Sequence, residues 1–88
     1  VLPRSGIQAN FGQDSVRGIE LALEVLPTKG YAVAEIVHAD NETKVDVGRA
    51  QAEKLIDQGC NLIFGCYDSG ITAAVAQVCE QKSIPLVV

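Results

Sequence analysis

The sequence contains no tryptophan and no methionine, and its 88 residues include only two phenylalanines and two tyrosines. Hydrophobic residues nevertheless make up 48% of the chain, so its core must be built mainly from alanine, valine, isoleucine and leucine. An aliphatic composition of this kind is typical of a parallel sheet that is covered by helices. The length allows at most one small domain, which buries only about 60% of the surface that the unfolded chain exposes.

Basic clusters and long apolar runs are also absent. Seven lysine and arginine residues stand against eleven aspartate and glutamate residues, which gives a net charge of -4 without any basic run. Nucleic-acid binding requires a basic patch, so the sequence predicts no nucleic-acid partner. No apolar stretch approaches the roughly 20 residues that a membrane-spanning helix needs.

Motifs of catalysis and metal binding are missing as well. The three cysteines, Cys60, Cys66 and Cys79, include no CxxC pair, and the single His38 is distant from them in the sequence. We therefore expect buried free thiols rather than a zinc or redox site. No GxGxxG or GxxxxGK[ST] motif is present, and one histidine cannot support a convincing Ser-His-Asp set. The sequence thus predicts no catalytic residue, no cofactor and no metal.

What the sequence does contain is a regular alternation of strand-like and helix-like segments. Short segments rich in valine, isoleucine and leucine predict strands at residues 1–3, 31–39, 60–65 and 84–88. Apolar residues at three- and four-residue steps predict helices at residues 13–26, from Val45 to a stop at Gly59, and from Ser69 onward. Asn10 and Gln13 have the spacing of a capping box at the start of the first helix.

The order β-α-β-α-β-α-β predicts an α/β fold with a doubly wound parallel sheet, because strands separated by single helices run parallel with right-handed crossovers. We expect the flavodoxin-like strand order 2-1-3-4. Ligands bind such sheets at the carboxyl ends of the strands, where the strand order reverses. The predicted site therefore lies in the loops of residues 4–12 and 65–68. Both chain ends read as strand, so we expect a piece of a longer protein.

The start of the third helix offers chemistry that suits a small anion. We expect Ser69 to be the N-cap, with its hydroxyl and the unpaired amides of the first turn at the positive end of the helix dipole. This arrangement fits a carboxylate, while Asp68 could pair with an ammonium group. The plainer alternatives are that Ser69 is an ordinary cap and Asp68 an added acid of the first turn.

The two predicted loops also hold aromatic and polar residues. Phe11 and Tyr67 could cover an apolar ligand group, with the tyrosine hydroxyl free to form a hydrogen bond; Tyr67 could equally be a surface aromatic. Arg4 and Ser5 belong to the same predicted edge. Asp40 ends the second predicted strand, and we interpret it as a turn residue, because a phosphoacceptor aspartate would follow the third strand and need an acidic cluster after the first.

Several short motifs occur in an order and at a spacing that together indicate a protein family. The chain contains a P-x-S-G loop, FG before a helix that carries G-x-E-L-A, K-L-I-x-x-G, and a glycine followed shortly by serine and IPL. Each is weak alone, but together they resemble type I periplasmic binding proteins, and most closely the branched-chain amino-acid (leucine/isoleucine/valine) substrate-binding group of ABC transporters. The resemblance extends over all 88 residues without large gaps.

In that family, two α/β lobes close over a solute that is delivered to a membrane permease. The resemblance implies that residues 1–88 are part of the N-terminal lobe, with the second lobe absent, and that the protein is not an enzyme. It implies an ABC-transporter component that binds an amino acid or similar small carboxylate, in the periplasm or, in a Gram-positive source, anchored outside the membrane. By resemblance, Phe11 lines the pocket, Tyr67 and Asp68 contact the solute side chain, and Ser69 binds the carboxylate.

The chain also departs from the family. The segment LPTKG, residues 26–30, makes a shorter connection after the first helix. Asn41 and Glu42 occupy the region where members often carry a cysteine that is bridged to the loop after the third strand. A different bridge is conceivable between Cys60 and Cys79, which both belong to the lower edge of the predicted sheet.

Two other functions stay open at this point. The fold also serves as a ligand-sensing domain of regulators and receptors, and GCY after the third strand resembles the amide-sensing regulators. A flavodoxin-like enzyme with Cys66 as nucleophile is the second alternative.

Overall fold

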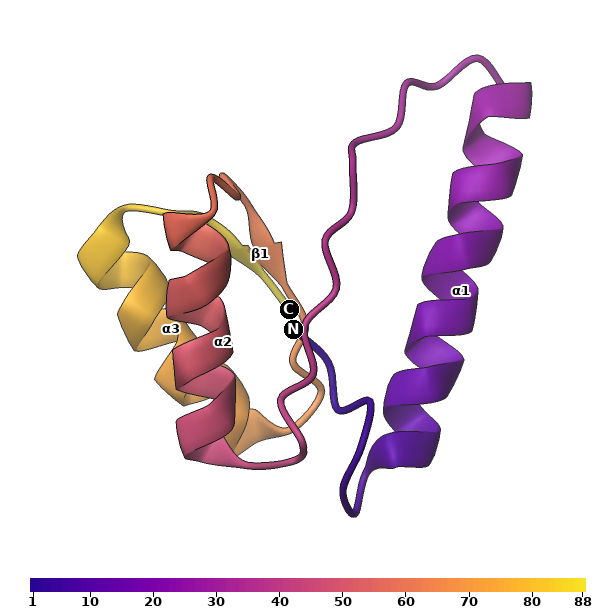
Figure 1. Ribbon diagram of the computed structural model, residues 1–88. Helices are drawn as coiled ribbons and strands as arrows, with labels where there is room; N and C mark the ends of the chain where they lie inside the picture. The colour runs from indigo at the N-terminus through magenta and orange to yellow at the C-terminus, as the bar shows by residue number, and fades with distance from the viewer.

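The computed structural model describes residues 1–88 and contains three helices and one pair of short strands (Figure 1). The elements in chain order are α1 Ala9–Thr28, α2 Val45–Asp57, β1 Ile63–Phe64, α3 Ser69–Lys82 and β2 Leu86–Val87. The two strands pair in parallel, with Ile63 opposite Leu86. The α/β class and the parallel direction agree with the sequence-based expectation. The complete strand order 2-1-3-4 stays a prediction.

The core lies between α2, α3 and the strand β1. The two helices pack on each other, as Figure 1 shows, and their buried faces meet Ile63 of β1. The residues that α2 and α3 bury have the predicted helical spacing; they are Gly48, Ala52, Leu55, Ile71, Ala74, Val75, Val78 and Cys79. The predicted stop of α2 is also confirmed, because Gly59 follows its last turn with φ of 102°, a conformation that favours glycine.

The strands predicted at residues 1–3 and 31–39 are not formed; only one isolated parallel bridge, between Leu2 and Asp40, is present in this region. Leu2 donates its amide to the carbonyl of Ala39 at 3.1 Å and accepts a hydrogen bond from the amide of Asn41 at 3.0 Å. Residues 31–39 form no strand, and the bridge residue Asp40 follows them, so the predicted strand at 31–39 is wrong over its whole length. A strand needs a partner that pairs its backbone groups, and residues 1–3 reach only the end of this segment.

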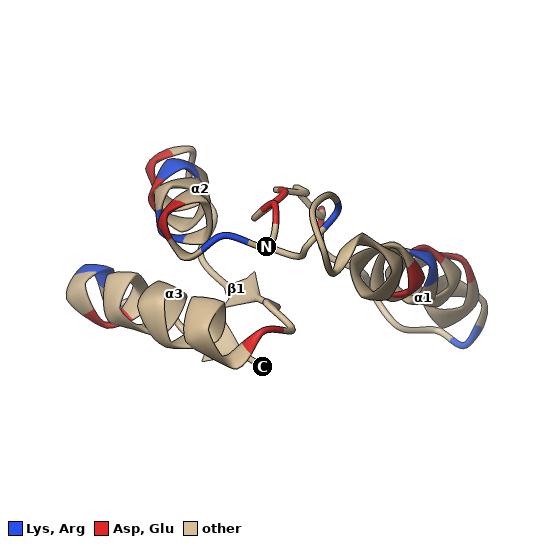
Figure 2. Cartoon of the chain, turned by 90° about the horizontal axis from the view of Figure 1, so that it is seen from below, with Lys and Arg blue, Asp and Glu red and all other residues tan.

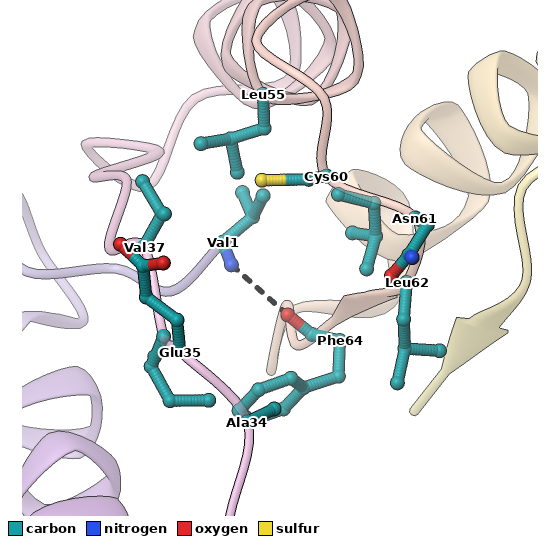
Figure 3. A pocket seen from close by; sticks show the side chains of 11 residues that line it. Val1, Ala34, Glu35, Val37, Leu55, Cys60, Asn61, Leu62 and Phe64 are labelled. Atoms are coloured by element: carbon teal, nitrogen blue, oxygen red, sulfur yellow. Dashed lines mark hydrogen bonds between the residues drawn. The ribbon is translucent and has the colours of Figure 1, made fainter.

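An apolar pocket of about 160 Å³ lies beside residues 34–37, which belong to the segment without strand structure (Figure 3). Residues 34–37 line one side of it and residues 60–64 the other, with Leu55 and Val1 between them. The amino group of Val1 donates a hydrogen bond to the carbonyl of Phe64 at 2.9 Å, which places the start of the chain next to β1. None of the predicted site residues lines this pocket.

Helix α1 begins at Ala9, four residues before the predicted start (Figure 1). Its N-cap is Gln8, so Asn10 lies inside the first turn, and the predicted capping box of Asn10 and Gln13 is wrong. The helix contacts the other elements little and buries only Gly12 and Val16. Its first two turns are therefore the part that is packed against the rest of the chain. None of the three helices combines the length and the apolar character that crossing a membrane requires.

Gly12 allows α1 to approach closely the backbone of Pro3, at the end of residues 1–3. A Cβ atom at this position would lie 1.8 Å from the carbonyl oxygen of Pro3, whereas nothing lies within 4 Å of a Cβ atom at Gly18 on the same helix. We expect Gly12→Ala to lower the free energy of unfolding by about 1–3 kcal/mol, because backbone must move to relieve the overlap.

The matched control is Gly18→Ala, which should raise the free energy of unfolding by about 0.5–1 kcal/mol through helix propensity. Urea unfolding of the full-length protein followed by circular dichroism measures both values. Equal effects of the two substitutions would contradict the contact between Gly12 and Pro3.

Candidate functional site

Four hydrogen bonds end on the carboxylate of Asp40 and fold the loop that precedes α1. Its Oδ1 accepts hydrogen bonds from the amides of Arg4 at 2.9 Å, Ser5 at 3.1 Å and Glu42 at 2.8 Å, and its Oδ2 accepts one from the Ser5 hydroxyl at 2.6 Å. Burial alone would raise the pKa of Asp40, but the hydrogen bonds from Ser5, Glu42 and Arg4 together outweigh it and hold the pKa below its ordinary value. Asp40 thus organises a turn, as the sequence indicated.

A fully buried asparagine joins this loop to the turn before α3. Asn41 donates from Nδ2 to the carbonyl of Cys66 at 3.3 Å and accepts from the amide of Thr43 at 2.9 Å. The hydroxyl of Thr43 accepts from the amide of Gln8 at 3.2 Å and donates to the carbonyl of Ser5 at 3.0 Å. Three loops that are distant in sequence therefore form one hydrogen-bonded unit.

The sequence reasoning did not identify Asn41 and Thr43 as the residues that join these loops. Both lie in a short polar segment between a predicted strand and a predicted helix, and this pattern is the same for a solvent-exposed turn. Only the 0% exposure of Asn41 in the folded chain separates the two cases.

The N-cap of α3 is Asp68 and not Ser69, so that prediction is wrong. Asp68 has an extended backbone, and its Oδ1 accepts a hydrogen bond from the amide of Ile71 at 3.1 Å. Ser69 is the first residue of the helix, and its exposed hydroxyl makes no hydrogen bond within the chain. The amides of Ser69 and Gly70 likewise donate to no group of the chain, as is usual for the first turn of a helix.

Phe11 and Tyr67 stack on each other at the same edge. Their ring centroids lie 4.8 Å apart, with 10° between the ring planes, and each residue is 52% exposed. Tyr67 has φ of 74°, a left-handed conformation that costs of order 1–3 kcal/mol for a residue of this size. The two aromatic residues that the sequence placed in separate loops therefore meet.

A hydrogen bond between their N-cap residues links α1 and α3 close to this aromatic pair. The side chain of Gln8, the N-cap of α1, donates from Nε2 to Oδ2 of Asp68, the N-cap of α3, at 3.3 Å. The first turns of α1 and α3 therefore lie side by side, and the positive ends of both helix dipoles are close to the aromatic pair.

The remaining predicted residues, Arg4 and Ser5, lie in the loop before α1. Arg4 lines a small pocket with Ile19, Phe64 and residues 36–39, a set that includes neither Phe11 nor Tyr67. Arg4 contacts Asp40 through its backbone amide, and its exposed side chain makes no ion pair. Lys and Arg residues are scattered over the chain without forming a cluster (Figure 2). No group of three or more His, Cys, Asp or Glu side chains is arranged to hold a metal ion.

The three cysteines are free, and the alternative bridge between Cys60 and Cys79 is not formed. The expected burial is confirmed for Cys66 and Cys79, whereas Cys60 is only partly buried. Burial raises the pKa of the Cys66 thiol, and it also raises the pKa of Cys79. A nucleophilic cysteine needs the opposite shift, toward the thiolate. The full burial of Cys66 and the direction of its pKa shift therefore offer no support for Cys66 as a nucleophile.

Comparison with known proteins gives the family. The family described as periplasmic binding protein matches the chain over residues 1–88. The chain belongs to the periplasmic binding protein family. The resemblance carried by its short motifs is thereby confirmed.

Several curated relatives are named Leu/Ile/Val-binding protein homologs. The chain is 37% identical over 86 residues to Leu/Ile/Val-binding protein homolog 8 of Brucella abortus, with 94% of this chain and 21% of the relative covered. It is 35% identical to Leu/Ile/Val-binding protein homolog 7 of Brucella suis, with coverages of 94% and 22%. The chain thus spans about a fifth of the length of these relatives. No solved structure matches it.

The hydrogen bonds of Asp40 make a specific prediction about acid stability. Because the pKa of Asp40 is lowered on folding, its carboxylate stabilises the fold above the ordinary pKa of 3.8, and this stability is lost as the pH falls through the lowered value. We expect Asp40→Asn to destabilise the full-length protein at neutral pH, with a difference from wild type that shrinks below about pH 4.

The measurement is urea unfolding at a series of pH values. Asp57→Asn is the matched control, because Asp57 is exposed and accepts no hydrogen bond. A difference between wild type and Asp40→Asn that does not change with pH would show that the carboxylate is not charged and paired as the structure has it.

Proposed function

We propose that the chain is part of the first lobe of an extracytoplasmic solute-binding protein of an ABC transporter, with a branched-chain amino acid or similar small carboxylate as its solute. The observation that carries this proposal is the meeting of the first turns of α1 and α3 at the stack of Phe11 on Tyr67. Membership of the periplasmic binding protein family supports it.

The backbone contacts support the strand order 2-1-3-4 for the complete lobe. Leu2 pairs with Asp40, Val1 bonds to Phe64, and β1 pairs with β2. In this order the site lies where the strand order reverses, beyond the carboxyl ends of the strands. Residues 1–88 then make up part of one lobe, and a second lobe supplies the other side of the solute pocket.

The start of α3 is proposed to hold the solute carboxylate. Ser69 offers a free hydroxyl, and the amides of Ser69 and Gly70 have no partner in the chain. Unpaired amides and the helix dipole together favour an anion at this position. Arg4 and Ser5 lie in the loop before α1, and Thr43 joins Ser5 of this loop to Gln8. We propose them as outer residues of the same site.

The aromatic pair is proposed to contact the solute side chain. Phe11 and Tyr67 present half-exposed ring surface, which suits an aliphatic group. Asp68 accepts one hydrogen bond on each oxygen within the chain, and a carboxylate has about four acceptor sites. Acceptor sites therefore remain on Asp68 for an ammonium group.

The relatives' names, which specify leucine, isoleucine and valine binding, support a branched-chain amino acid as the solute. We propose a membrane permease as the partner. We place the protein in the periplasm or, in a Gram-positive source, anchored outside the membrane. We propose no catalytic activity, no cofactor and no nucleic-acid partner. Solute binding would shift the two lobes toward a closed state.

Isothermal titration calorimetry on the full-length protein tests this function. We expect saturable binding of L-leucine and at least about 100-fold weaker binding of L-leucine methyl ester, because the ester cannot present a charged carboxylate to the start of α3. Equal affinity for the ester would contradict the carboxylate site. Absence of binding by leucine, isoleucine and valine alike would contradict the proposed solute class.

Two substitutions at one position separate the hydroxyl from the amide of Ser69. We expect Ser69→Ala to weaken leucine binding about tenfold and Ser69→Pro to weaken it about tenfold further, because proline also removes the amide. Proline is tolerated at the first position of a helix, and the extended backbone of Asp68, with ψ of 131°, suits a following proline.

The control is Ser83→Ala, which makes the same side-chain deletion at the opposite, exposed end of α3. It should leave leucine affinity unchanged. Equal affinities of the alanine and proline variants at Ser69 would show that its amide does not contact the solute.

A further inference from the structure

Gln8 occupies an unusual position for an N-cap residue. It starts α1, but its side chain caps nothing in that helix. Nε2 instead reaches 60 residues along the sequence to Oδ2 of Asp68, at 3.3 Å. The backbone of Gln8 is fixed independently, because its amide donates to the hydroxyl of Thr43. The side chain is therefore free to serve the contact between the two helices.

The other half of the Gln8 carboxamide argues against a purely stabilising role. Its Oε1 is covered by protein and has no hydrogen-bond partner. A covered acceptor without a partner costs stability. A residue selected only to hold the fold together would avoid that cost, whereas a residue that must orient a neighbouring carboxylate can retain it.

We propose that Gln8 is a positioning residue of the solute site. Asp68 has two oxygens, of which Oδ1 is held by the amide of Ile71 and Oδ2 by Gln8. The two bonds fix the rotation of the carboxylate, and with it the acceptor sites left for a solute ammonium group. Because Tyr67 precedes Asp68 and Phe11 lies one turn after Gln8, the same bond holds the aromatic pair in its stack. This inference rests on the proposed function for its ligand.

Leucine affinity of the full-length protein, measured by calorimetry, provides the first test. We expect Gln8→Ala to weaken binding of L-leucine about tenfold. Gln13→Ala is the matched control, since Gln13 is exposed on the same helix and makes no hydrogen bond; it should bind leucine as the wild type does. An affinity of Gln8→Ala within twofold of the control would overturn the inference.

The pH profile of Gln8→Glu distinguishes positioning from general stability. The introduced carboxylate repels Asp68 at neutral pH, but two adjacent carboxyl groups share a proton at a higher pH than either would alone. Once protonated, the introduced group can donate to Asp68 as Nε2 does. We therefore expect the leucine affinity of Gln8→Glu, relative to wild type, to rise as the pH falls from about 8 to about 5.

Gln8→Ala should show no such recovery. The other charged groups along the loops that contact Gln8 are Arg4, Asp40, Glu42 and Lys44, and they are common to all variants. The leucine affinity of each variant is therefore divided by the wild-type affinity at the same pH, and this ratio removes the effect of the shared groups. A flat ratio for Gln8→Glu would contradict a positioning role.

A ligand-free measurement separates this inference from the proposed function. The stacked rings of Phe11 and Tyr67 shift each other's proton resonances, and we expect Gln8→Ala, but not Gln13→Ala, to move these resonances toward unstacked values. If the wild type does not bind leucine and Gln8→Ala still alters the stack, the role of Gln8 stands and the proposed solute is wrong. Unaltered ring resonances in Gln8→Ala would overturn the role of Gln8.

Discussion

The carboxylate of Asp40 is the acceptor on which the geometry of the candidate site depends. It gathers the amides of Arg4, Ser5 and Glu42 and the hydroxyl of Ser5, and so folds the first loop against the turn before α2. The folded loop sets where α1 starts, and this places Phe11 against Tyr67. A residue that the solute need not touch thus determines the position of residues proposed to touch it. Charged acceptors suit such a task, because they form stronger hydrogen bonds than neutral ones.

The loop before α1 joins two parts of the chain that differ in how they are packed, the helix α1 and the core of α2 and α3. The helices α2 and α3 pack around a continuous aliphatic core, whereas α1 is packed mainly at its first two turns, where Gly12 approaches Pro3. The pairs Gln8–Asp68 and Phe11–Tyr67 are contacts between the two parts. Because these pairs belong to the proposed solute site, binding there would also reinforce the attachment of α1.

The helices with strong apolar periodicity and the parallel pair of β1 and β2 were predictable from the sequence, and the lack of a strand at residues 31–39 was not. The buried faces of α2 and α3 follow from apolar spacing alone, and Gly59 stops α2 as expected. The strand at residues 31–39 has the right composition, but pairing depends on a neighbour, which composition does not reveal. At the site, sequence placed Phe11 and Tyr67 together correctly. It assigned the cap to Ser69 because serine and aspartate are both good caps, and only the Asp68–Ile71 hydrogen bond decides between them.

We propose that the unpaired amides at the start of α3 receive the carboxylate of a small amino acid. Amide resonances of the full-length protein, recorded by nuclear magnetic resonance during titration with L-leucine, test it most directly. We expect the amide protons of Ser69 and Gly70 to move downfield, since hydrogen bonding to a carboxylate deshields the donor proton. Saturable leucine binding that leaves both resonances unmoved would contradict the claim.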